Sequence, residues 1–287
     1  MNKYLASDRT SLPNLVVIGG AKTGSTSLHY YLSRHPDVFM SSEKEVRFFS
    51  DHFKKGADWY RSHFRHAGAF AIRGETSPQY TAFPQVTGVP ERMHGLIPDA
   101  KLIYIVRDPL VRMWSHFAFV TPVSDPEEFR HALTPLDTNP FVAGSRQCLQ
   151  LEQYLPYFPL EQILVLTYAE LRHNRRETLA RVFRFLEVEE TYYDSECEAE
   201  LNISRVFPRE HTALSKLVAA VADLHLGRWI PTRVGVPMRN WGLRLFSKPP
   251  SRPLMDASLE GRLREIFSKD ANRLRRLTGL PLAHWSV

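Results

Sequence analysis

An apolar run that passes directly into a glycine-rich loop constrains this chain more than any other feature of its sequence. Residues 15–18 read Leu-Val-Val-Ile, and residues 19–27 read Gly-Gly-Ala-Lys-Thr-Gly-Ser-Thr-Ser. The aliphatic run is typical of a strand buried on both faces of a parallel sheet. A helix is then expected over about residues 25–34. It should end there, because Pro36 disfavours a helical conformation at His35. The stretch therefore predicts a strand–loop–helix corner.

The loop in this corner is suited to binding a phosphate or sulfate. Its three glycines, between residues 19 and 24, permit sharp turns and leave backbone N–H groups open to an anion. The unpaired amides and the positive dipole end of the helix meet the same loop, and Lys22 adds a positive charge. A plain strand–glycine–helix corner is the alternative, but the glycines and hydroxyls gathered around one lysine favour the anion site. The predicted ligands are Ala21, Lys22, Thr23, Gly24, Ser25, Thr26 and Ser27.

The order of residues in this loop differs from that of a nucleoside-triphosphate P-loop. That pattern, G-x-x-x-x-G-K-[ST], places lysine after the last glycine and then a hydroxyl that holds magnesium. In this chain Lys22 precedes Gly24, and Ser25 occupies the lysine's place. The loop is therefore expected to bind an anion without a metal-bridged triphosphate, and no metal site is predicted.

Composition and charge limit the class of protein and its partners. The 287 residues are 43% hydrophobic and 24% charged, as is ordinary for a globular chain. The net charge of +6 suits an acidic ligand. It permits a nucleic-acid partner but does not require one, and none is predicted.

Cysteine content and hydrophobicity bear on the compartment. Cys148 and Cys197 lie outside any C-x-x-C or metal-ligand spacing, so neither a disulfide framework nor a zinc site is expected. No apolar run reaches the roughly 18 residues of a membrane span. The residues before the first strand lack the apolar segment of a signal peptide. These features together predict a cytoplasmic location.

Strand, turn and helix recur along the chain, which predicts an α/β fold with a central parallel sheet and helices on both faces. We expect a single domain over residues 1–287, with a core of about 13–190 and a C-terminal part, 191–287, that completes the cofactor and acceptor sites. Residues 121–140 are rich in Pro and Asp and are expected to form a long surface loop. Further strands are predicted at residues 37–40, 70–72, 101–106 and 162–168, and further helices at 56–64, 109–120, 141–157, 175–186, 211–224 and 259–277.

Arg107 and Ser115 are candidates for binding a second phosphate. Arg107 comes directly after the predicted strand at 101–106, at the edge where open α/β sheets bind ligands. Ser115 follows eight residues later on the next predicted helix. An arginine so placed can bind a phosphate with two parallel hydrogen bonds. From the residues alone, pairing of Arg107 with Asp108 and simple packing of Ser115 explain the pattern equally well.

Glu45 is a candidate general base, provided that it faces the anion loop. It follows Glu43 and Lys44, and from these residues alone a solvated charged turn is the better explanation. His94 and His116 are rival bases, although a partly exposed helical histidine explains each of them better. The residues by themselves leave the base unassigned.

Three motifs, in matching order and spacing over the first 120 residues, resemble those of the sulfotransferases that use 3′-phosphoadenosine 5′-phosphosulfate (PAPS). Residues 22–28 resemble the loop and helix that hold the donor's 5′-phosphosulfate. Residues 45–49, Glu-Val-Arg-Phe-Phe, are similar to a motif of the heparan-sulfate sulfotransferase branch and its bacterial relatives. Residues 106–109, Val-Arg-Asp-Pro, together with Ser115 resemble the motif that binds the 3′-phosphate.

The resemblance implies a P-loop-like sulfotransferase fold and a reaction. A sulfuryl group would move from PAPS to a hydroxyl of a carbohydrate, glycolipid or small-molecule acceptor, leaving adenosine 3′,5′-bisphosphate. Glu45 and Lys22 are implied as catalytic residues, with Glu45 as the base, and Arg107 and Ser115 as ligands of the 3′-phosphate. No metal is implied, because a sulfuryl group carries less negative charge than a phosphoryl group.

The chain departs from the heparan-sulfate branch at several positions. Arg47 stands where that branch often has histidine, and Ser50 where it often has aspartate. Residues 75–78, Glu-Thr-Ser-Pro, replace an E-K-[TS] element, so a lysine that contacts the acceptor or the base is missing. These departures leave the acceptor undetermined. Residues 202–209 are the best candidate for the basic loop that closes over the 3′-phosphate.

Two other functions remain open at the level of sequence. A P-loop kinase would share the fold and the anion loop but would need magnesium and ATP. A nucleic-acid-binding module would use the positive charge and the arginines near residues 228–252, and its binding to any duplex would be sensitive to salt. The lack of an arrayed basic face makes this module the weakest of the three functions.

Overall fold

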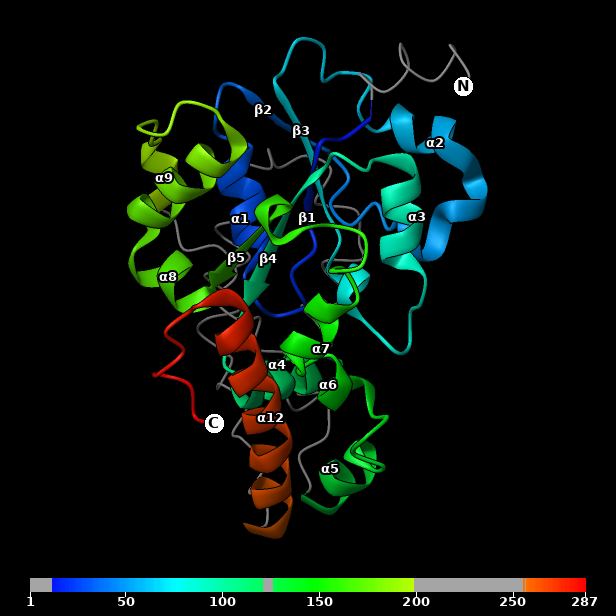
Figure 1. Cartoon of the computed structure of the whole chain (residues 1–287), viewed down its shortest axis with the longest axis vertical. Coiled ribbons are helices and arrows are strands. Elements are labelled where there is room, and N and C mark those ends of the chain that lie inside the picture. Colours follow the sequence, from blue (N-terminus) through cyan, green and yellow to red (C-terminus); the bar gives the residue numbers. More distant parts are fainter. Residues whose placement is uncertain (1–11, 121–125, 199–254, 256) are drawn as a thin grey trace, which may run out of the picture.

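Five parallel strands form the centre of the fold (Figure 1). The computed structural model describes residues 12–120, 126–198, 255 and 257–287. Parallel neighbours require crossover connections, and helices supply them. The strands are β1 (Leu15–Val17), β2 (Val38–Met40), β3 (Ile72–Thr76), β4 (Lys101–Val106) and β5 (Ile163–Thr167), and they lie in the order β2-β3-β1-β4-β5.

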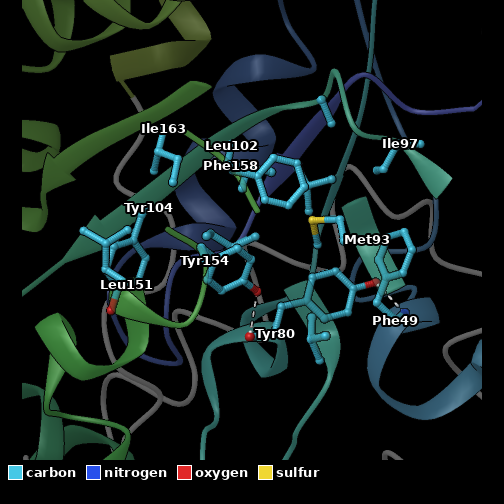
Figure 2. Packing of buried hydrophobic residues seen from close by; sticks show 14 of the residues in the cluster. Phe49, Tyr80, Met93, Ile97, Leu102, Tyr104, Leu151, Tyr154, Phe158 and Ile163 are labelled. Atoms are coloured by element: carbon cyan, nitrogen blue, oxygen red, sulfur yellow. Dashed lines mark hydrogen bonds between the residues drawn. The ribbon is translucent and has the colours of Figure 1, made fainter. Parts of the chain in front are cut away.

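Helices cover both faces of this sheet because both faces are apolar. In β4, Leu102 and Tyr104 belong to one core, whereas Ile103 and Ile105 belong to the other, since successive residues of a strand point to opposite faces. Figure 2 shows the first core, in which Tyr154 and Phe158 pack over the sheet. The first face is covered by α2 (Gly56–Ser62), α3 (Val89–Leu96), α7 (Gln147–Glu152) and α12 (Ala257–Thr278), and the second by α1 (Ser25–Leu32), α8 (Tyr168–His173) and α9 (Arg175–Leu186).

A third apolar cluster lies beyond the sheet, where α12 packs on α4 (Pro109–Val120), α5 (Pro126–Leu133) and α6 (Pro140–Ala143) (Figure 1). Phe117, Phe129 and Phe267 are buried there. The rings of Phe117 and Phe129 lie edge to face with centroids 4.7 Å apart, an arrangement that aromatic pairs favour. The cluster therefore fixes α4, the helix that begins two residues after Arg107.

The predicted α/β fold, with helices on both faces of a parallel sheet, is confirmed, but three local predictions are wrong. The strand expected at residues 70–72 spans Ile72–Thr76 instead. Residues 121–140 include α5, because Phe129 and Leu133, one helical turn apart, are both buried. The helix expected over 141–157 is divided into α6 and α7.

The helical backbone between α6 and α7 is interrupted at Arg146, whose φ of −80° and ψ of 81° lie outside the helical region. Gly144 keeps helical angles, with φ −65° and ψ −15°. A Cβ at Gly144 would lie 2.9 Å from Nη1 of Arg112 and 3.0 Å from the carbonyl oxygen of Pro140. The division therefore comes from the turn at Arg146, and the glycine leaves room for the buried Arg112 guanidinium beside it.

Three segments that the sequence analysis singled out lie outside the described residues. They are the predicted helix over 211–224, the Pro- and Arg-rich segment near 228–253 and the candidate phosphate loop at 202–209.

Cys148 and Cys197 are buried and form no disulfide. Within the described ranges, no helix combines the length and the apolar character needed to cross a bilayer.

Candidate active site

The segments that carry the predicted site residues meet at the carboxyl edge of the sheet. Parallel strands all end at one edge, and open α/β sheets bind their ligands there. The glycine-rich loop follows β1, Arg107 follows β4, and Ser77 follows β3. The backbone N–H of Glu45 donates to the carbonyl oxygen of Thr76 at 2.9 Å, which joins the loop after β2 to the end of β3.

The glycine-rich loop has a conformation that presents backbone N–H groups. Lys22 (φ 71°) and Gly24 (φ 97°) adopt positive φ, and successive N–H groups in such turns form concave anion sites. The Thr23 hydroxyl is buried and donates to the carbonyl oxygen of Gly20 at 2.6 Å, closing the turn. Gly24 caps α1 and has no side chain that could cap the first turn of the helix, which is the kind of helix N-terminus that suits an anion.

Arg107 is brought directly against this loop. Its Nη1 donates to the carbonyl oxygen of Lys22 at 2.8 Å, and its guanidinium stacks 4.4 Å from the centre of the Tyr168 ring. The Gln147 side chain accepts from the backbone N–H of Arg107 at 2.7 Å and donates to its carbonyl oxygen at 2.6 Å. The two predicted phosphate-binding residues, Lys22 and Arg107, therefore lie at one site, whereas Ser115 lies half-buried further along α4.

Arg112 is a site residue that sequence reasoning missed. Its side chain is buried, with Nε donating to the carbonyl oxygen of Ala21 at 3.1 Å and Nη1 donating to Ser145 Oγ at 3.0 Å. Among the described residues no carboxylate pairs with it. Burial lowers the pKa of Arg112 to about 10, so the group stays charged at neutral pH. A buried positive charge therefore lies directly behind the anion loop.

Helical spacing could have revealed this residue. Arg112, His116 and Phe119 recur at intervals of four and three on α4, and Phe119 reaches the loop, where its ring centre lies 4.5 Å from Nζ of Lys22. Together they form the side of α4 that faces the loop. This spacing along one side of the predicted helix is the sequence signal that points to a second arginine at the loop.

Neither rival histidine is suited to act as a base. Burial, together with the positive charges of Arg112 and Lys22, lowers the pKa of His116 to about 3. Such an imidazole is neutral at pH 7 but binds a proton only weakly. His94 is exposed on α3, where it packs against the rings of Tyr157 and Phe158 on the first face of the sheet.

Glu45 has a carboxylate held by three neighbouring donors. Arg47 Nη2 donates to it at 2.8 Å, Lys44 Nζ at 3.1 Å and Gln79 Nε2 at 3.2 Å. Burial raises the pKa of this carboxyl, but the hydrogen bonds from Arg47, Lys44 and Gln79 and the charge of Lys44 outweigh burial, and the net pKa is lowered. Glu45 is therefore ionised at neutral pH. Its half-buried side chain does not fit a fully solvated turn.

Glu75, from the element that departs from the heparan-sulfate pattern, does not contact Glu45. Its side chain is buried and accepts hydrogen bonds from Tyr60, Tyr80 and Ser77. The neighbouring Thr76 hydroxyl lies 3.0 Å from Nδ1 of His29. Arg47, rather than Glu75 or a histidine, is thus the charged group that reaches Glu45 most closely.

Metal-ligating side chains are not clustered in the described part of the chain. Across residues 12–120, 126–198, 255 and 257–287, no group of three His, Cys, Asp or Glu side chains is arranged to hold a metal ion. The cationic groups at the site are side chains of lysine and arginine.

The family model described as "Sulfotransferase domain" matches residues 12–205. Heparan sulfate glucosamine 3-O-sulfotransferase 6 from Homo sapiens is 27% identical over 278 residues, which cover 94% of this chain and 73% of the relative. Membrane-associated sulfotransferase kil1 from Dictyostelium discoideum is 36% identical over 111 residues, 38% of this chain and 23% of the relative. The similarity to the slime-mould protein thus spans about a quarter of that protein's length.

A solved structure supports the same fold. The sulfotransferase from Alicyclobacillus acidocaldarius superimposes with a TM-score of 0.61 and 22% identity, covering 96% of this chain and 99% of the other. At this level of identity the likeness concerns the fold alone. The predicted sulfotransferase fold is therefore confirmed.

Replacing Gly24 by alanine should destabilise the protein. The positive φ costs an L-residue about 1–2 kcal/mol, and the new Cβ would lie 2.9 Å from Cδ2 of Tyr168. We expect urea denaturation to show a loss of at least ~1 kcal/mol in the free energy of unfolding. Gly261→Ala is the matched control: it lies in α12 with open space around it and should gain up to about 1 kcal/mol. Wild-type stability of Gly24→Ala would contradict the assigned loop conformation.

Proposed function

This chain belongs to the sulfotransferase family, enzymes of the EC 2.8.2 class, and we propose that it moves a sulfuryl group from PAPS to an acceptor hydroxyl. The observation that carries the proposal is the 2.8 Å hydrogen bond between Arg107 and the carbonyl oxygen of Lys22. It places a guanidinium beside the anion loop. A nucleotide with phosphates at both its 5′ and 3′ positions is a ligand that matches two such neighbouring cationic groups.

The residues of the loop fit the 5′ end of this donor. The N–H groups of the loop and of the first turn of α1, with the Thr26 and Ser27 hydroxyls, would hold the 5′-phosphate. Lys22 would neutralise the negative charge that grows on the oxygen bridging sulfur and phosphorus as that bond breaks. Arg112 adds a fixed positive charge from behind the loop, where burial strengthens its effect.

Arg107 would bind the 3′-phosphate, with Ser115 as a second ligand. The guanidinium is held by the Lys22 carbonyl oxygen and the Tyr168 ring, and Gln147 fixes the backbone of Arg107, so the side chain's orientation is set before a ligand arrives. A preorganised arginine can form two parallel bonds with a phosphate.

Glu45 would act as the general base. When the acceptor oxygen forms its bond to sulfur, the hydroxyl proton passes to the Glu45 carboxylate, and the bond between sulfur and the donor's bridging oxygen breaks. The lowered pKa keeps the carboxylate in its proton-accepting form at neutral pH. Arg47 and Gln79 would hold it in a fixed direction through their hydrogen bonds.

A saccharide or small-molecule hydroxyl is the proposed acceptor. The name of the human relative, a heparan sulfate glucosamine 3-O-sulfotransferase, supports a carbohydrate as the first class to test. A screen of saccharides, glycolipids and small alcohols with sulfur-labelled PAPS would identify the acceptor.

The proposal also expects adenosine 3′,5′-bisphosphate to bind in the presence of EDTA, whereas magnesium-dependent binding of ATP alone would favour a kinase.

Glu45→Gln should abolish most turnover and spare nucleotide binding. Loss of a positioned base costs about two to four decades of rate, while the donor site is untouched. Turnover is measured with labelled PAPS and the Kd of adenosine 3′,5′-bisphosphate by calorimetry. Glu43→Gln is the matched control, because the carboxylate of Glu43 faces His63 instead. Near-normal turnover of Glu45→Gln would remove this residue as the base.

Arg107→Ala should reduce the preference for a 3′-phosphate. A charge-assisted hydrogen bond contributes about 1.5–3 kcal/mol, so the affinity for adenosine 3′,5′-bisphosphate should fall by about 10- to 100-fold. Adenosine 5′-monophosphate lacks the 3′-phosphate, and its affinity should change little. Calorimetry of both nucleotides gives the ratio, and equal losses for the two would exclude the assigned role.

Arg47→Met should shift the acid limb of the pH–rate profile upward. The Arg47 hydrogen bond lowers the pKa of Glu45 against the effect of burial, so its loss raises that pKa and the base becomes protonated at a higher pH. The midpoint of the acid limb of kcat/KM should rise. Arg65→Met, whose guanidinium contacts His66, should leave the midpoint in place. An unchanged or lower midpoint for Arg47→Met would refute the charge balance at Glu45.

A further inference from the structure

A buried carboxylate without a cationic partner among the described residues lies under the loop that carries Glu45. Glu75, on β3, is 0% exposed. It accepts hydrogen bonds from Tyr60 Oη at 2.6 Å, Tyr80 Oη at 2.8 Å and Ser77 Oγ at 2.7 Å. Three hydroxyl groups thus replace water around one carboxylate, which satisfies a group that is otherwise costly to bury.

Two of these hydroxyls also hold the loop. Ser77 Oγ accepts the backbone N–H of Arg47 at 3.0 Å, and Tyr80 Oη accepts the backbone N–H of Phe49 at 3.2 Å; Figure 2 shows the second bond. A hydroxyl has one proton to donate. Because both hydroxyls donate that proton to Glu75, their lone pairs are left to accept the amides.

The loop needs such anchors because its backbone is strained. Glu45 (φ 67°) and Arg47 (φ 55°) both adopt the left-handed region, which costs a non-glycine residue about 1–2 kcal/mol and persists only where the surroundings fix it. Three hydrogen bonds hold the backbone N–H groups of alternate residues in this loop. The N–H of Glu45 donates to the carbonyl oxygen of Thr76 at 2.9 Å. The N–H groups of Arg47 and Phe49 donate to the two hydroxyls that are oriented by Glu75.

We propose that Glu75 is a positioning residue for catalysis. Acting through Ser77 and Tyr80, it holds residues 45–49 in the conformation that directs the Glu45 carboxylate at the acceptor hydroxyl. The inference rests on the proposed role of Glu45 as the base. Glu75 itself touches no reacting atom, since its carboxylate is enclosed by the three hydroxyls.

Two tyrosine variants form a matched pair that tests whether Glu75 acts through Tyr80. Tyr60→Phe and Tyr80→Phe each remove one hydroxyl that donates to Oε1 of Glu75, but only the Tyr80 hydroxyl also accepts an amide of the loop. We expect kcat of Tyr80→Phe to fall by about 10- to 100-fold, as misplacement of a catalytic group does, with the Kd of adenosine 3′,5′-bisphosphate within about twofold. Tyr60→Phe should retain kcat within about threefold.

A double variant, Tyr80→Phe combined with Glu45→Gln, separates positioning from a general structural effect. If Tyr80 acts through Glu45, then Tyr80→Phe should add no further loss of kcat to Glu45→Gln, because the group being positioned is already gone. A structural defect would lower the residual rate again. Amide hydrogen exchange adds a readout without turnover: exchange at Arg47 and Phe49 should accelerate in Glu75→Gln and Tyr80→Phe, while the amides of β1 and β4 keep their protection.

The possible outcomes distinguish a failure of the role proposed for Glu75 from a failure of the proposed function. Equal effects of Tyr60→Phe and Tyr80→Phe on kcat, or additive losses in the Glu45→Gln background, would overturn the role of Glu75. Full turnover of Glu45→Gln would instead overturn the base assignment. If Glu75→Gln does not fold, the tyrosine pair and Ser77→Ala, which should behave like Tyr80→Phe, still decide the question.

Discussion

The hydrogen bond from Arg107 to the carbonyl oxygen of Lys22 is the interaction on which the site depends. It joins the ends of β1 and β4, two neighbouring strands that meet at the carboxyl edge because the sheet is parallel. Gln147 and Tyr168 hold the same arginine from α7 and α8. Helices from both faces of the sheet therefore converge on one residue, and the position of the anion loop follows from the packing of the whole core.

The electrostatic balance of the site follows from where its charges are buried. Arg112 is a buried cation whose described partners are carbonyl and hydroxyl oxygens, whereas Glu75 is a carboxyl group that accepts from hydroxyls and whose pKa is raised by burial. The first lies behind the anion loop and the second under the loop of Glu45. Glu45 itself is paired with Arg47 and Lys44. The donor half of the proposed reaction thus has a fixed positive charge beside it, which needs no reorganisation when a ligand binds.

Local sequence was sufficient for those parts of the fold that depend on local patterns. The strand at β4 and the helix at α4 lie at the predicted residues, because an aliphatic run and a proline at the first helical position are local signals. The end of β3 was missed because Glu75 and Thr76 are polar, and their burial depends on partners from other elements, Tyr60, Tyr80 and His29. Arg112 was missed for a similar reason, since its acceptors come from residues as distant as Ala21 and Ser145.

The most direct test of the proposed donor site is a crystal structure of the protein with adenosine 3′,5′-bisphosphate. The 5′-phosphate should lie against the first amides of α1 and Lys22, and the 3′-phosphate should accept hydrogen bonds from Arg107. Glu45 should face the open side of the 5′-phosphate, where a sulfuryl group would be transferred. A nucleotide bound elsewhere, or bound with its 3′-phosphate out of reach of Arg107, would contradict the assignment of this edge of the sheet as the donor site.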